Sequence, residues 1–181
     1  MRKTLLAAVL TLLASAPAGA APHRFGSFIV DDQHPNVLVL AGDVTPSAPL
    51  DFHRALDEFP QIDVLGLHSR GGDVLAGLMI ALEVLDRGIN TQITTGKACY
   101  SACAYIFLAG ASRQVDGELG THMPTVETME SADRVAVELD MRYVLAKLKV
   151  PIVVFDSIFN TPNGEIRIFD AAEAAALGLN R

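Results

Sequence analysis

The stretch from Gly96 to Gly110 constrains the fold of this chain more than any other. It opens with a turn of small residues and continues as an apolar helical pattern, and the β-branched run Thr91 to Thr95 before it is predicted to be a strand. Ser101 therefore lies where a strand turns into a buried helix. The unpaired N–H groups and the dipole at a helix start stabilise negative charge, so this position suits a nucleophile as well as an ordinary serine N-cap.

Strands and helices alternate through the first two thirds of the chain, which predicts an α/β fold with a mainly parallel sheet. In folds of this kind, ligands bind at the carboxyl ends of the strands. The turns at Gly71-Gly72 and at Ser101 both follow predicted strands, so we expect both at that edge. The predicted strands are 27–30, 36–40, 62–67, 91–95, 113–116 (a strand or turn), 118–123 and 165–169, and the predicted helices are 45–59, 73–87, 101–109, 131–148, 152–159 and 170–178.

Residues 1–20 have the three parts of a secretory signal peptide: a basic start, a short apolar core and a small-residue cleavage site. The apolar core is too short to span a bilayer. We therefore expect cleavage after Ala20 or Ala21, a periplasmic or secreted location, and no membrane insertion once the signal is removed. Residues 21–181 have about the length of one domain and are predicted to form a single one.

The charge of the chain narrows the classes of partner. Lysine and arginine number 14 against 21 aspartates and glutamates, a net charge of −7, and loss of Arg2 and Lys3 with the signal leaves 12 against 21, a net charge of −9. An acidic chain without a basic cluster is not typical of proteins that bind nucleic acid or anionic membranes. Half of the residues are hydrophobic, which is enough for a compact core.

The two cysteines, Cys99 and Cys103, flank Ser101. Paired thiols of an exported protein tend to be oxidised, so we expect a disulfide that braces the Ser101 turn, with two buried free thiols as the alternative. A metal site would need more ligands than two cysteines, and no histidine lies nearby in the sequence, so no metal is predicted.

Two further stretches have residues suited to acyl-transfer chemistry. Ser69 to Gly77 contains the pair Gly71-Gly72 between a predicted strand and a predicted helix, where glycine lets the backbone approach a substrate closely. Gly120 to Pro124 contains His122, which could serve as the general base for Ser101. Each feature alone is ordinary: a tight turn, and a surface or core histidine.

The order and spacing of these three stretches resemble the Clp protease proteolytic subunit and the wider Clp/crotonase superfamily, and more narrowly its exported bacterial branch of small Clp-protease-like proteins. In that family a Ser-x-Gly-Gly-(x)4-Gly segment precedes a helix, a serine heads a second helix, and a His-x-Pro follows. The C-terminal stretch from Ala171 to Leu179 is also similar to the closing segment of the family, and the resemblance covers roughly residues 36 to 180. The matching positions are Ser69, Gly71, Gly72 and Gly77, then Ser101, then His122 and Pro124.

The resemblance implies a Clp protease/crotonase-like fold of repeated ββα units, with a mainly parallel sheet flanked by helices. It implies Ser101 as the nucleophile, His122 as its base, and the N–H groups of Gly72 and Ala102 as the oxyanion hole. Two backbone donors from separate turns could converge on the oxyanion of a tetrahedral intermediate. It also implies a peptide or protein substrate and allows a homo-oligomer, and acyl-enzyme chemistry requires no cofactor.

The chain departs from the family pattern at two points. Arg70 stands where a proline often precedes the glycine pair, and no motif identifies the third member of the catalytic triad. By position, Glu165 is the nearest carboxylate. Asp156 and Asp170 are its rivals, although the first could be a helix-surface acid and the second a plain N-cap. Lys97 would allow a Ser-Lys pair, but it is more simply a solvated turn residue.

These observations predict an exported serine hydrolase, a peptidase that works through a Ser-His-based acyl-enzyme mechanism with a backbone oxyanion hole. The alternative is a non-catalytic peptide- or protein-binding module on the same fold, because fold does not determine function. Acyl-CoA chemistry of the crotonase type fits poorly, because those enzymes are cytoplasmic and this chain begins with an export signal.

Overall fold

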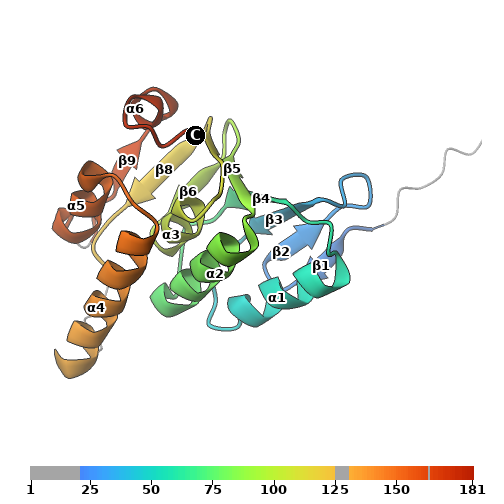
Figure 1. Ribbon diagram of the computed structural model, residues 1–181, viewed down its shortest axis with the longest axis horizontal. Coiled ribbons are helices and arrows are strands. Elements are labelled where there is room, and N and C mark those ends of the chain that lie inside the picture. Colours follow the sequence, from blue (N-terminus) through green and yellow to red (C-terminus); the bar gives the residue numbers. More distant parts are fainter. Residues whose placement is uncertain (1–20, 125–130, 163) are drawn as a thin grey trace, which may run out of the picture.

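The computed structural model describes residues 21–124, 131–162 and 164–181 (Figure 1). The predicted signal peptide, residues 1–20, lies outside the described residues. Among the described helices, none is both long and apolar enough to cross a membrane.

A twisted sheet forms the larger layer of strands, in the order β1-β2-β3-β4-β5-β7. The first two strands pair antiparallel with their neighbours, whereas β3, β4, β5 and β7 are parallel. This arrangement confirms the predicted α/β class and its mainly parallel sheet. The strands are β1 (His23–Phe25), β2 (Phe28–Val30), β3 (Val37–Ala41), β4 (Val64–His68), β5 (Asn90–Ile93) and β7 (Arg113–Val115).

A second, smaller sheet consists of β6 (Ala98–Tyr100), β8 (Glu118–Thr121) and β9 (Arg167–Phe169) in the order β6-β8-β9. Here β6 and β8 are parallel, and β9 runs antiparallel to β8. An isolated bridge between Ser69 and Cys99 connects the end of β4 to β6. The two sheets therefore meet where β4 leaves the larger sheet.

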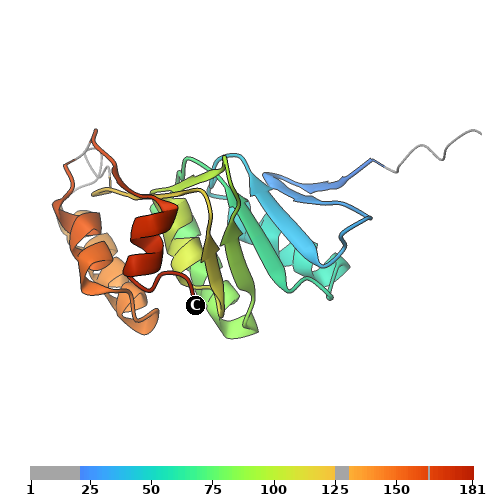
Figure 2. The same ribbon diagram turned by 90° about the horizontal axis from the view of Figure 1, so that it is seen from above.

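The helices cover these sheets. Figures 1 and 2 show α1 and α2 beside each other along the larger sheet, and α4, α5 and α6 at the end of the molecule away from β1. The ends of α2 follow from its sequence: the Asp73 carboxylate accepts a hydrogen bond from Ala76 N–H, and Gly88 ends the helix with φ of +67°. The helices are α1 (Ala48–Glu58), α2 (Val74–Arg87), α3 (Ala102–Leu108), α4 (Ser131–Lys147), α5 (Ile152–Asn160) and α6 (Ala171–Ala176).

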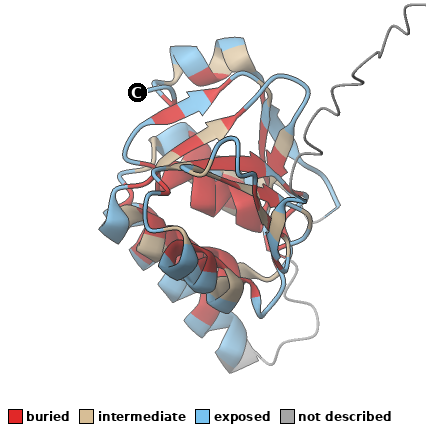
Figure 3. Ribbon diagram, turned by 90° about the vertical axis from the view of Figure 1, so that its right-hand side faces the viewer, coloured by how far each residue is buried: buried red, intermediate tan, exposed pale blue. Residues whose placement is uncertain are grey.

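The short helix α3 lies at the centre of the core, and each of its residues is buried. Figure 3 shows the buried residues gathered between the strands and the outer helices. Gly77 of α2 allows a close approach to the start of α3, because a Cβ added at Gly77 would lie 2.8 Å from Ala102 O. The residue that precedes α3, Ser101, is thus held by dense packing.

The strand that leads into Ser101 differs from the prediction. The run Thr91–Thr95 does not continue into the Ser101 turn: β5 ends at Ile93 in the larger sheet, and the separate strand β6 reaches Ser101 in the smaller one. Strand β6 has only three residues and owes its conformation to pairing with β8 and to the bridge to Ser69. Such pairing between distant segments leaves no local signal in a three-residue stretch.

Candidate active site

The three stretches singled out in the sequence meet at one edge of the structure. Parallel pairing aligns Tyr100 with Gly120, and Ser101 N–H donates a 2.9 Å hydrogen bond to Gly120 O. Because the strands are parallel, their carboxyl ends place Ser101 after β6 next to the residues that follow β8. The Ser69–Cys99 bridge brings the glycine turn after β4 to the same edge.

Ser101 has an unusual backbone conformation, with φ of +56° and ψ of −123°. A serine in this region costs on the order of 1–3 kcal/mol, and such strain gathers at functional sites. The residue occupies the N-cap position of α3, yet its side chain makes no capping hydrogen bond. It is nearly buried, with 9% of its surface exposed. A sharp, strained strand-to-helix turn of this kind is what presents a nucleophilic serine in α/β hydrolases.

The glycine pair packs directly against this turn. Gly71 and Gly72 have φ of +96° and +143°, which side chains rarely allow. A Cβ on Gly71 would lie 2.7 Å from Ser101 Cβ and 3.0 Å from Ala102 N, and one on Gly72 would collide with Val44 O. Glycine at position 71 therefore lets the two turns touch, and glycine at position 72 lets the same turn pack against the Val44 backbone.

The same contact brings two candidate oxyanion donors into neighbouring turns. Val44 holds the glycine turn from the other side, because its N–H donates to Gly71 O (2.8 Å) and its carbonyl accepts from Asp73 N–H (2.7 Å). Within the described residues, the N–H groups of Gly72 and Ala102 donate to no other group of the protein. Two backbone donors are thus available on either side of the Ser101 turn.

His122 directly follows β8 and is partly exposed. Its Nδ1 lies 2.7 Å from Met123 O. A carbonyl oxygen can only accept, so Nδ1 is the donor and the neutral ring keeps its lone pair on Nε2. No hydrogen bond joins this ring to Ser101 among the residues described, a common state of catalytic pairs in the absence of substrate.

The three candidate carboxylates come from α5, from the residues before β9 and from the start of α6. Glu165 and Asp156 are exposed, and Asp170 caps α6 by accepting a 2.9 Å hydrogen bond from Glu173 N–H. Within residues 21–124, 131–162 and 164–181, none of the three is hydrogen-bonded or ion-paired to His122. Glu165 as the third triad member therefore stays a prediction.

Lys97 lies at the wrong end of β6 for a Ser-Lys pair. It is exposed and precedes the strand, whereas Ser101 follows it. At 3.3 Å per residue, the four steps between them separate their Cα atoms by about 13 Å. Arg70, the departure from the family pattern, is exposed beside the glycine pair.

Cys99 in β6 and Cys103 in α3 are at disulfide-bonding distance, with their Cα atoms 5.3 Å apart. Both side chains are fully buried. The bridge spans Ser101, so it joins the strand before the strained residue to the helix after it.

Tyr100, directly before Ser101, is bound to the neighbouring strand. Its hydroxyl donates to the Glu118 carboxylate, which links the side chains of β6 and β8. Burial, together with this hydrogen bond to an anion, raises the pKa of the Tyr100 phenol to about 12.

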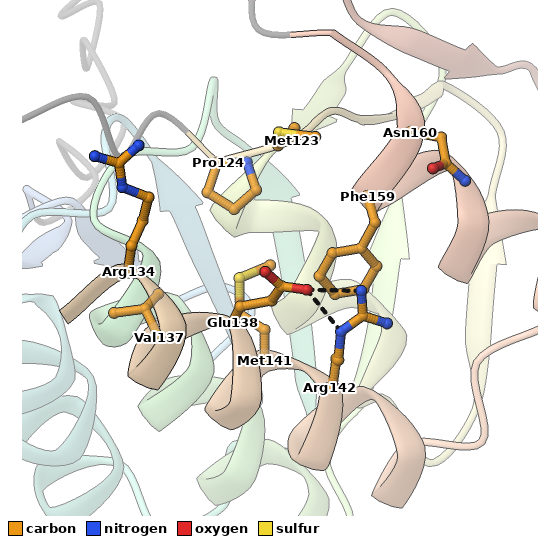
Figure 4. A pocket seen from close by; sticks show the side chains of 9 residues that line it. All are labelled: Met123, Pro124, Arg134, Val137, Glu138, Met141, Arg142, Phe159 and Asn160. Carbon is orange, nitrogen blue, oxygen red and sulfur yellow. Dashed lines mark hydrogen bonds and ion pairs between the residues drawn. The ribbon is translucent and has the colours of Figure 1, made fainter. Parts of the chain in front are cut away.

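A pocket of about 290 Å³ is lined on one side by Met123 and Pro124, the two residues that follow His122 in the chain (Figure 4). Its walls are mostly apolar, and at one end Arg142 donates to Glu138 through Nε (2.9 Å) and Nη2 (2.7 Å) while lying 4.0 Å from the centre of the Phe159 ring. This volume is at the lower end of the range for small-ligand pockets and is large enough for one large side chain. The lining residues are Met123, Pro124, Arg134, Val137, Glu138, Met141, Arg142, Phe159 and Asn160.

Sequence reasoning missed both this pocket and the Met123 carbonyl. The pocket joins the residues after β8 to α4 and α5, which only the tertiary structure brings together. A signal for the carbonyl did exist: Pro124 restricts the backbone of the preceding residue, Met123, to extended conformations. The described residues contain no group of three or more His, Cys, Asp or Glu side chains placed to hold a metal ion.

The sequence matches no protein-family model and no curated protein sequence. The structure, by contrast, is similar to solved Clp protease subunits. ClpP1 from Listeria monocytogenes superimposes with a TM-score of 0.63 at 15% identity, over 81% of this chain and 89% of ClpP1. A point mutant of the same protein gives a TM-score of 0.62 with the same identity and coverage. At this identity the likeness establishes the fold: the chain has the α/β fold of the Clp proteases.

Proposed function

We propose that this protein is an exported serine hydrolase, a peptidase of the Clp-protease-like type. One observation carries the proposal. Ser101 is held in a strained turn, its side chain makes no capping bond to α3, and the glycine turn that touches it offers a second N–H group without a partner among the described residues. Strain of this kind is retained where it serves a function, and a structural serine has no need of it.

In the proposed reaction, Ser101 Oγ attacks the carbonyl carbon of a peptide bond. His122 Nε2 accepts the hydroxyl proton, and the N–H groups of Gly72 and Ala102 stabilise the oxyanion. The imidazolium then protonates the leaving amine, the C–N bond breaks, and an acyl-enzyme remains. The same histidine then deprotonates a water molecule that attacks the ester carbonyl. The C–O bond to Ser101 breaks, the acid product leaves, and the imidazolium returns the proton to Ser101 Oγ.

The pocket beyond His122 supports a peptide substrate. It begins at Met123 and Pro124, so a substrate carbonyl held between Ser101 and His122 would have a neighbouring side chain close to it. Met141 and Phe159 supply apolar surface, and we assign this pocket to a large apolar side chain beside the scissile bond.

Labelling with a fluorophosphonate tests the proposal. The mature protein should form a covalent adduct that mass spectrometry locates on the Ser101 peptide, and Ser101→Ala should abolish it. Ser47→Ala is a matched control, because Ser47 is also an N-cap without a side-chain capping bond but has an ordinary helical φ of −85°. This control should label like the wild type.

A peptide-binding module on the same fold is the second candidate. It is favoured by the lack of a Ser101–His122 hydrogen bond within the described residues. In that case the folded wild type would not label between about pH 6 and 9, where a histidine base becomes neutral. Ser101→Ala would then bind peptides as well as the wild type does.

The proposal also includes the location of the protein and its oligomeric state. The N-terminal pattern of residues 1–20 supports export into the periplasm or medium, and the buried cysteine pair suits an oxidising compartment. The Clp protease fold supports a homo-oligomer as the working form. The proposed reaction needs no metal ion or organic cofactor.

A further inference from the structure

We propose that the main-chain carbonyl of Met123, and not a carboxylate, orients His122 and determines which ring nitrogen acts as the base. The inference rests on the proposed function, in which His122 activates Ser101. It makes the site a Ser-His pair whose third member is a backbone group.

The contact between Nδ1 and Met123 O, 2.7 Å long, forms a hydrogen bond when Nδ1 carries a proton. Since the carbonyl has no hydrogen to give, the neutral imidazole carries its proton on Nδ1 and its lone pair on Nε2. A triad carboxylate imposes this same tautomer. The Met123 carbonyl can thus orient the His122 ring as the carboxylate of a catalytic triad does.

Met123 is restrained on both sides of its Cα atom. Its N–H, in the peptide bond with His122, donates a 3.0 Å hydrogen bond to Thr161 O, and Pro124, in the peptide bond of the Met123 carbonyl, restricts Met123 to extended conformations. The carbonyl is therefore fixed relative to the end of β8, and with it the plane of the His122 ring.

A second contact fixes the end of β8 itself. Ser157 Oγ donates to Val154 O (2.7 Å) and accepts from Thr121 Oγ1 (2.6 Å), so the residue before His122 is tied to α5. Pairing of Thr121 with Arg167 of β9 holds the same point from the other side. An orienting group needs a rigid support of this kind to be effective.

The consequence for catalysis is specific. A neutral carbonyl provides the correct tautomer and orientation, but it lacks the full charge with which a carboxylate stabilises the imidazolium. Removal of Glu165, Asp156 or Asp170 should then leave the His122 tautomer unchanged, whereas loosening the Met123 peptide should alter it.

Nitrogen-15 NMR of the mature, uniformly labelled protein reads the tautomer without reference to activity. At a pH where the histidines are neutral, His122 should show a protonated Nδ1 and an unprotonated Nε2, with the signal assigned by its loss in His122→Asn. A predominant Nε2–H tautomer would overturn the proposal, whether or not the protein labels with fluorophosphonate.

Two variants identify the orienting group. Pro124→Ala should mix the two tautomers and slow fluorophosphonate labelling at least about fivefold, while Pro35→Ala, in a turn far along the chain, should do neither. Glu165→Gln should leave the tautomer as in the wild type. A shift of the His122 tautomer in Glu165→Gln, with a tenfold loss of labelling, would assign the role to that carboxylate instead.

One outcome separates this inference from the proposed function. If neither the wild type nor any variant labels but Nδ1 of His122 is protonated, the proposed hydrolase activity is wrong and the proposed orientation of His122 is kept.

Discussion

Ser101 is one of two non-glycine residues with positive φ in the part of the chain that the structure describes, and the comparison with the other is informative. Lys149, with φ of +52°, is exposed just after α4, where left-handed residues commonly end helices. Ser101 lies in the core before a helix, where no such need exists. Its positive φ is therefore not that of an ordinary helix end.

The strain at Ser101 should be measurable. Glycine at position 101 can adopt the observed φ and ψ without strain, although it costs more entropy on folding than alanine. The unfolding free energy of Ser101→Gly should therefore exceed that of Ser101→Ala by about 1 kcal/mol. Ala136→Gly, in the exposed face of α4, should instead lose about 1 kcal/mol. Urea unfolding measures all three, and a Ser101→Gly variant less stable than Ser101→Ala would contradict strain at this position.

Gly71 offers a second test at the scale of one residue, because Gly164 has nearly the same backbone angle. Their φ values are +96° and +94°, but a Cβ on Gly164 meets nothing within 4 Å, whereas one on Gly71 meets the Ser101 turn. Gly164→Ala should cost about 1–2 kcal/mol of backbone strain alone. Gly71→Ala should cost at least about 2 kcal/mol more through overpacking and should abolish labelling. Equal unfolding free energies for the two variants would contradict a tight steric contact between the Gly71-Gly72 turn and the Ser101 turn.

At the scale of elements, the site depends on β6, a strand of three residues held by its neighbours. The backbone pairs it with β8, the Tyr100 hydroxyl reaches Glu118 of the same strand, and the cysteine pair ties it to α3. These contacts all surround the strained residue, so each should affect the presentation of Ser101.

The cysteine pair should stabilise the protein modestly. A short loop removes little entropy from the unfolded chain, so the double variant Cys99→Ala/Cys103→Ala should lose about 2 kcal/mol of unfolding free energy. If Ser101 is the nucleophile, labelling should slow more than this loss suggests, because the bridge spans the Ser101 turn. Thiol titration of the unfolded, unreduced protein checks the premise, and two free thiols would remove it.

Tyr100 predicts a pH dependence of stability. Folding raises its pKa from 10 to about 12, so the protonated phenol is favoured in the folded state. This contribution is complete below pH 10 and is lost as pH rises from 10 through about 12. The unfolding free energy of the wild type should therefore fall relative to that of Tyr100→Phe over this range. Parallel stability curves for the two proteins would exclude the linkage.

At the scale of the whole molecule, two sheets of different size converge on one edge. The glycine turn follows β4 of the larger sheet, and Ser101 and His122 follow β6 and β8 of the smaller one. The pocket adds α4 and α5, so the candidate site collects residues from most of the chain after β3.

A last prediction concerns removal of the signal peptide, residues 1–20. Removal of the signal should leave a protein that begins near Ala21 or Pro22. N-terminal sequencing of the exported protein measures this directly. An exported form that retains Met1 would contradict signal cleavage.

The sequence alone determined the α/β class and the principal helices, because the periodicity of α2 and its caps at Asp73 and Gly88 are local signals. It also placed Ser101 at a strand-to-helix turn. It missed β1 and misplaced the strand before Ser101, because short strands form through pairing with distant segments and have little pattern of their own.

Only the tertiary structure decided how the site is assembled. The positive φ of Ser101, the contact of Gly71 with that turn and the pocket beyond His122 each depend on segments 20 or more residues apart. The bond from His122 to the Met123 carbonyl is local in sequence, but Thr161 and Pro124 hold that carbonyl in place. The candidate site residues could be chosen from the sequence because few residue types can serve as a nucleophile, a base or a close-approach glycine. Their orientations could not, because orientation is set by packing that the chain acquires only when it folds.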